Sequence, residues 1–111
     1  MAPRLTTDFW VSAYLQRLGA EMIPAYVTRR GDATAGAVVV KVATLDGRAR
    51  AWERSVDLMT GGRRWVILSE GEERAVDEVL MRARSRDPDL WVIEIEDRQG
   101  RSLLDQPGLD D

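Results

Sequence analysis

The feature that most constrains the fold is a pair of strand-like stretches joined by a turn signal. Residues 37–45 are strongly apolar, and residues 48–55 alternate between large and small side chains, as strands with two different faces do. Asp46 and Gly47 stand between them. This dipeptide favours the type I′ turn of a two-residue hairpin, because both central positions of that turn need positive φ. The sequence therefore predicts an antiparallel β-hairpin.

Two amphipathic helices are predicted from their terminal signals. Thr7 is followed by an acid, which is typical of a helix start, and apolar residues then recur every three or four positions until Gly19. Ser69 and Glu72 form a capping box at the start of a second helix. This helix must end near residue 87, because Pro88 cannot continue it.

The order of the elements predicts the fold class. Three further strands are expected, at residues 25–30, 64–68 and 90–97. The order is then helix, four strands, helix, strand, in a single domain of residues 1–111. Two helices do not easily cover both faces of five strands, so we expect an α+β two-layer sandwich: a mostly antiparallel five-stranded sheet with both helices on one face. Residues 101–104 are expected to pair briefly, and residues 105–111 to form a flexible acidic tail.

This architecture leaves one sheet face bare. We assign the more apolar set of strand residues to the covered face: Val38, Val40, Val42, Ala49, Ala51, Trp91, Ile93 and Ile95. The bare face then mixes cations, anions and apolar groups: Val39, Lys41, Arg48, Arg50, Trp52, Val92, Glu94 and Glu96.

Composition limits the chemistry that the chain can perform. It has no Cys and no His, which excludes disulfides, thiol or imidazole nucleophiles, and thiolate or imidazole metal sites. Its 16 basic and 19 acidic residues are unevenly placed: residues 29–64 hold eight cations and four acids, whereas residues 70–97 hold four cations and ten acids. No apolar stretch approaches the ~20 residues of a membrane span. We expect a cytoplasmic protein with no cofactor and no membrane contact.

Two groups of charged residues are candidate sites with simpler explanations. Arg29 and Arg30, with Asp32 and Lys41, could bind an anion beside the loop of residues 31–36, which has the glycine spacing of a phosphate-binding loop. That loop lacks the Lys and Ser/Thr that follow in such motifs, and it leads into a strand, so we interpret it as a hairpin loop. Adjacent strand residues also point to opposite faces, so the two arginines cannot share one anion without a bulge.

Two acids of the last strand, Glu94 and Glu96, share a face and lie ~7 Å apart. A metal-dependent hydrolase would need more convergent acids than this strand supplies. Pairing with Lys41 or Arg50 on a neighbouring strand explains the two glutamates at less cost. We therefore assign no catalytic residue and no metal ligand.

The most suggestive group is Trp52 with Arg48, Arg50 and Arg54, which places an aromatic ring among guanidinium groups on the bare face. Single-stranded nucleic acid stacks on such surfaces, but Glu94 on the same face and the lack of an assured second aromatic disfavour it. Trp and Arg are also enriched at the energetic centres of protein interfaces. We therefore favour a non-enzymatic binding or protein-interaction module, with a second copy or another protein as partner.

Two alternatives remain open at this stage. One is an enzyme or sensor that binds a small anionic ligand through Arg29, Arg30 or Lys41, with Asp32 or Glu94 for acid-base work. The other is the binding of single-stranded nucleic acid on the face of Trp52.

Several segments of the chain have a distinctive sequence: Trp10-Val11, Ile23-Pro24-Ala25, Arg29-Arg30-Gly31-Asp32, Ala35-Gly36-Ala37, Val40-Lys41 and, as the longest, the run from Asp87 to Asp97. From Leu5 to about Leu104 the chain resembles a family of short bacterial proteins classed as a domain of unknown function. The resemblance implies a free-standing bacterial single-domain protein. It implies no activity, substrate, partner or catalytic residue.

Overall fold

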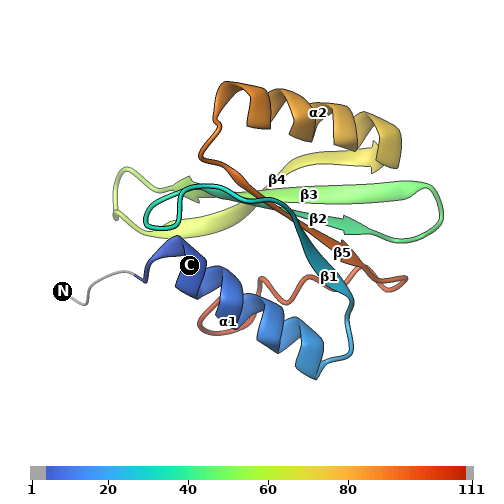
Figure 1. Ribbon diagram of the computed structural model, residues 1–111, viewed down its shortest axis with the longest axis horizontal. Helices are drawn as coiled ribbons and strands as arrows, with labels where there is room; N and C mark the ends of the chain where they lie inside the picture. Colours follow the sequence, from blue (N-terminus) through green and yellow to red (C-terminus); the bar gives the residue numbers. More distant parts are fainter. Residues whose placement is uncertain (1–4, 110–111) are drawn as a thin grey trace.

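The protein folds as a five-stranded sheet between two helices (Figure 1). The computed structural model describes residues 5–109. The elements of this part of the chain are α1 (Thr7–Ala20), β1 (Ala25–Arg29), β2 (Val38–Ala43), β3 (Arg48–Val56), β4 (Arg63–Glu72), α2 (Glu73–Arg86) and β5 (Trp91–Glu96). The α+β class and the order helix, four strands, helix, strand are therefore confirmed. Neither helix of the described chain is long and apolar enough to cross a bilayer.

The strands are arranged in the order β1-β5-β2-β3-β4. β5 runs parallel to β2, and the other neighbouring pairs are antiparallel, which confirms a mostly antiparallel sheet. Because β5 separates β1 from β2, residues 31–36 are not the hairpin loop that we expected. They pack on the segment before β5, where a Cβ at Gly31 would collide with the carbonyl group of Asp89.

The two helices lie on opposite faces of the sheet, so the prediction that both cover one face is wrong (Figure 1). On one face, which we call the α1 face, α1 packs against Val40 of β2. On the other, the α2 face, α2 packs against Val39 of the same strand. The reason is that all six residues of β2 are buried. A central strand that is apolar on both sides needs cover on both sides.

The hairpin register explains why some residues were assigned to the wrong face. A two-residue turn would place Val42 opposite Ala51, but Val42 lies opposite Arg50, since the loop has three residues. Asp46 closes this loop, because its carboxylate accepts hydrogen bonds from the hydroxyl group of Thr44 and the backbone N–H of Arg48. A register shift of one residue moves every side chain of the partner strand to the other face.

As a result, β3 presents its large side chains to the α1 face and its small ones to the α2 face. Trp52, opposite Val40, and Arg50, opposite Val42, lie on the α1 face. Ala49 and Ala51 pack beneath α2, contrary to the assignment from sequence.

The second helix begins later than its capping signal predicts. Ser69 pairs with Ala51 inside β4, and α2 starts at Glu73 with no side-chain hydrogen bond at its N-cap, Glu72. The capping box therefore does not form. Pairing with β3 over the length of β4 outweighs the local helix signal.

The chain after β5 folds back over the α1 face and packs there. Leu103, Leu104 and Leu109 join the core of this face, and the indole N–H of Trp65 donates to the carbonyl oxygen of Leu109 over 2.7 Å. No strand forms at residues 101–104, and Leu109, within the tail that we predicted, packs in the core. Asp110 and Asp111 of that predicted tail lie outside the described residues.

Replacing Leu109, which is 3% exposed, by alanine should therefore destabilise the fold. We expect the free energy of unfolding, measured by urea denaturation, to fall by about 2–4 kcal/mol, the usual cost of removing a buried leucine side chain. Met59→Ala is the control, because Met59 is 93% exposed and should change stability by less than ~0.5 kcal/mol. Equal stabilities of the two variants would show that the end of the chain is not packed.

Candidate functional site

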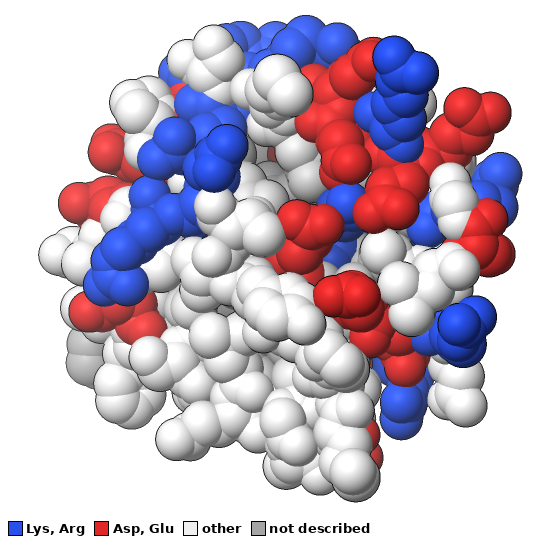
Figure 2. Space-filling model, turned by 45° about the vertical axis from the view of Figure 1, so that its right-hand side comes forward, with Lys and Arg blue, Asp and Glu red and all other residues white. Residues whose placement is uncertain are grey.

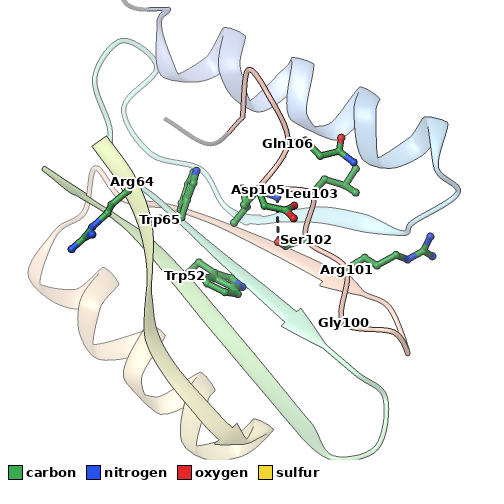
Figure 3. Close-up of a pocket in the computed structure, with 10 residues that line it drawn as sticks. Trp52, Arg64, Trp65, Gly100, Arg101, Ser102, Leu103, Asp105 and Gln106 are labelled. Carbon is green, nitrogen blue, oxygen red and sulfur yellow. Dashed lines mark hydrogen bonds between the residues drawn. The ribbon is translucent and has the colours of Figure 1, made fainter. Parts of the chain in front are cut away.

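The α1 face is hollowed where β3 and β4 meet the returning chain. A cavity of about 620 Å³ lies between Trp52 of β3, Trp65 of β4 and the segment of residues 100–106 (Figure 3). Leu103 and Leu104 contribute to its wall, and most of its surface is apolar, although Arg64, Arg101 and Asp105 also line it. α1 does not line the cavity, which stays open to solvent.

A second cavity of about 340 Å³ adjoins the first and shares Trp52 and Gly100 with it. Its lining includes three arginines, namely Arg48, Arg50 and Arg98. We call the two cavities together the Trp52 groove. The groove has an apolar end at Trp65 and a cationic end at the three arginines, with Trp52 between them.

The charges of the cationic end are only partly balanced. Arg50 pairs with Glu70 over 2.7 Å and lies 5.8 Å from the centre of the Trp52 ring. Asp46 closes the β2-β3 loop, and hydrogen bonds from the Thr44 hydroxyl and the backbone of Arg48 lower the pKa of its carboxyl group. The side chains of Arg48 and Arg98 are exposed and make no ion pair with any described residue.

At the apolar end of the groove, Trp65 contacts Arg54 and Trp10. The guanidinium group of Arg54 lies 4.4 Å from the ring centre of Trp10 and 4.9 Å from that of Trp65, which is a cation–π arrangement. Trp65 also contacts Trp10, with 5.6 Å between ring centres. Of the residues predicted around Trp52, Arg54 therefore supports the groove from the core and does not line it.

The wall formed by residues 100–106 depends on Asp97. Its carboxylate accepts hydrogen bonds from the backbone N–H and the guanidinium group of Arg101, at 2.7 to 3.1 Å. The hydrogen bond from the Arg101 side chain holds the pKa of Asp97 below its usual value. Tyr14 of α1 adds a second anchor, because its hydroxyl group donates to the carbonyl oxygen of Ser102. Burial raises the pKa of this tyrosine, so its hydroxyl group stays protonated.

On the α2 face, Lys41 is surrounded by carboxylates. Its ammonium group lies 2.7 Å from Glu73, 2.6 Å from Asp77 and 2.9 Å from Glu94, while its side chain is 2% exposed. Burial alone would lower the pKa of Lys41, but the hydrogen bonds to Asp77, Glu73 and Glu94 outweigh it and raise the pKa above its usual value. A lysine held in its protonated form is neither a nucleophile nor a base.

The three carboxylates around Lys41 are the described residues best placed to hold a metal ion, since one oxygen of each lies within 4.8 Å of the others. The ammonium group of Lys41 stands among them as their counter-ion. Glu94 was predicted as a partner of Lys41, whereas Glu73 and Asp77 were missed. Their spacing of four residues on a helix was the signal that could have found them.

Figure 2 shows charged residues crowded on the α2 side, at the top, and few on the α1 side below.

The remaining predicted residues do not assemble into an anion site. Arg30 lies over the ring of Trp91, 4.8 Å from its centre, and Arg29 donates to the neighbouring carbonyl group of Thr28. The carboxylate of Asp32 accepts a hydrogen bond from the backbone N–H of Ala35. Trp91 belongs to the core of the α1 face, so Arg30 and Lys41 lie on opposite sides of the sheet.

Glu96 and Glu94 pair with residues of β2 that face α2, so both lie on the face opposite to Trp52. The structure therefore brings Arg48, Arg50 and Trp52 together, as predicted, and separates them from Glu94 and Glu96. It adds Trp65, Arg98 and residues 100–106, which sequence reasoning did not connect with Trp52.

A family model described as a protein of unknown function, DUF1491, matches residues 5–105. The chain belongs to this family. The match covers nearly the same residues as the resemblance seen in the sequence, and it confirms that resemblance. The description of the family names no activity. No curated protein matches the chain.

Three solved structures from two bacteria are similar to this chain. A crystal structure and an NMR structure of a DUF1491 family protein from Caulobacter crescentus are each 41% identical to the chain, with TM-scores of 0.80 and 0.82. They cover 93% and 96% of this chain, and 95% and 97% of their own. A solution structure of a protein from A. tumefaciens is 30% identical, with a TM-score of 0.72, and covers 85% of this chain and 86% of its own.

Replacing Lys41 by methionine should leave three neighbouring carboxylates without their counter-ion. Because the carboxylates are one third to one half exposed, we expect the free energy of unfolding at neutral pH to fall by about 1–3 kcal/mol. Ca²⁺ should restore part of the loss in this variant only, because carboxylate oxygens are its preferred ligands.

The control for Lys41→Met is Arg50→Met, which breaks an exposed ion pair and should cost less than ~1 kcal/mol. Equal losses in the two variants would contradict a special role for the Lys41 cluster.

Asp97→Asn should lower the midpoint of thermal unfolding at pH 7, because the folded state stabilises the charged carboxylate. A lowered pKa contributes stability above the usual value of 3.8, and this contribution is lost as the pH falls through the lowered pKa. The difference between wild type and variant should therefore shrink in acid. Asp105→Asn, at an exposed position of the same segment, should show no such pH-dependent difference.

Proposed function

We propose that this protein acts by binding, and that the Trp52 groove is its binding site. The observation that carries the proposal is the groove itself: an open hollow on the sheet, with two indole rings at its floor and arginines without ion pairs at one end. Trp and Arg are the residues that most often dominate binding energies. The volumes of both cavities also fall in the range of ~300–1,000 Å³ that is typical of small-molecule sites.

Binding is favoured over catalysis by the state of the titratable groups. Acid-base catalysis needs a group whose pKa is tuned towards neutral pH by its surroundings. In the groove the pKa of Asp46 is lowered, which moves it away from neutral pH, and the carboxylate of Glu70 is paired with Arg50. Lys41, the buried cation outside the groove, is held protonated by its three carboxylates. These acids therefore serve as counter-charges.

The fold also changes which partner the groove suits. Self-association was expected through the sheet face that carries Trp52. The fold divides the residues assigned to that face: Val39 and Val92 pack beneath α2, whereas Arg50 and Trp52 lie on the α1 face. Both edge strands, β1 and β4, carry a bulge, and such irregularities disfavour pairing between the edges of two copies. The groove instead favours a ligand with an apolar part for the floor and a negative charge for Arg48 and Arg98.

The test is a thermal-shift screen of the wild type against a panel of anionic and aromatic compounds. A ligand at ten times its dissociation constant or more should raise the unfolding midpoint by about 5 °C, and the shift should disappear in Trp52→Ala. Arg86→Gln, on the exposed surface of α2, is the matched control and should respond like the wild type. A panel without any ligand, or shifts that persist in Trp52→Ala, would contradict the proposal.

A further inference from the structure

We infer that the ligand of the Trp52 groove is a nucleoside phosphate, with the base at the apolar end and the phosphate at the cationic end. The inference rests on the proposed function and names its ligand class. It starts from the two kinds of surface in the groove. Trp52 and Trp65 line the first cavity with two leucines, and Arg64, Arg101 and Asp105 also line it; Arg48, Arg50 and Arg98 line the second. A nucleotide carries the same two chemistries, a planar ring system and an anion.

The apolar end has the features of a stacking platform. Trp65 is fixed by the hydrogen bond to the carbonyl oxygen of Leu109 and by contacts with Trp10 and Arg54. Trp52 stands between this end and the arginines, with Arg50 over its ring. Bases of any sequence stack on aromatic side chains, and a platform that is already fixed loses little entropy on binding.

The cationic end suits a phosphate of low charge. Arg48 and Arg98 line it without ion pairs among the described residues, and guanidinium groups match phosphate oxygens in geometry. Asp46 and Glu70 lie in the same lining, so three arginines face two acids. A monophosphate can use the unpaired arginines, whereas the additional charges of a triphosphate meet the two carboxylates. We therefore expect the monophosphate to bind more tightly.

The sequence raised two objections to nucleotide binding, and the fold removes both. Glu94 and Glu96 were expected beside Trp52, but they lie on the opposite face. A second aromatic ring was not assured, and Trp65 supplies it in the same groove. A peptide with acidic and apolar side chains would also meet arginines and indoles. Both indoles line one cavity, however, and three arginines line the cavity that adjoins it, which favours a single compact ligand.

The experiment is a calorimetric titration of the wild type with adenosine monophosphate, adenosine triphosphate, adenosine, inorganic phosphate and a ten-residue single-stranded oligonucleotide. Adenosine monophosphate should bind at least about tenfold more tightly than adenosine or phosphate alone, and more tightly than the triphosphate. An oligonucleotide that binds better still, with an affinity that falls steeply with salt, would identify the end or backbone of a strand as the natural source of the same chemistry.

Variants assign the two ends separately. Trp52→Ala should weaken adenosine monophosphate and adenosine by at least about fivefold each, as lost stacking does. The double variant Arg48→Gln with Arg98→Gln should weaken the monophosphate by a similar factor and leave adenosine unchanged. Because both arginines are exposed, this variant should fold normally, and Arg86→Gln should bind like the wild type. Nucleotide binding that is unchanged in both groove variants would overturn the inference.

The failure of this inference can be told apart from the failure of the proposed function. If neither nucleotides nor the oligonucleotide bind, but an acidic peptide or another anion of the panel binds and depends on Trp52, the groove is a binding site for a different class and only the inference falls. If nothing binds in a Trp52-dependent manner, both fall.

Discussion

The burial of β2 on both faces is the constraint on which the rest of the structure depends. Val40 faces α1 and Val39 faces α2, so each helix must take one side of the sheet. Lys41 lies in the same buried strand, and its charge is tolerated because three carboxylates from α2 and β5 bind its ammonium group. The cluster therefore joins the second helix to the centre of the sheet.

The groove is a consequence of this division. One helix per face cannot cover five strands. On the α1 face the chain after β5 covers a further part of the sheet and adds Leu103, Leu104 and Leu109 to the core. This cover does not close over β3 and β4, where Trp52 and Trp65 remain partly exposed beside residues 100–106. The binding site that we propose is thus the part of the sheet that neither α1 nor the returning chain covers.

Local signals were enough to predict the elements and their order, and long-range pairing decided what could not be predicted. Five strands and two helices follow from strand alternation, the helical spacing of apolar residues and Pro88, whereas neither helix has a side-chain hydrogen bond at its N-cap. The faces were misassigned because a single added residue in the loop at Asp46 shifts the hairpin register. The cluster of Arg48, Arg50 and Trp52 was found since all three lie on one strand. Arg98 and Trp65 were missed, because only the folded-back chain and β4 bring them to the groove.

The central claim, that each face of the sheet is covered by one helix and that Trp52 lies in an open groove, is tested most directly by the accessibility of single indoles. Fluorotryptophan can be incorporated at all four positions and its ¹⁹F resonances assigned by Trp→Phe variants, and a soluble paramagnetic agent then broadens the resonances of exposed rings. We predict strong broadening for Trp52 and almost none for Trp91, which is 1% exposed. Equal protection of Trp52 and Trp91 would contradict the account.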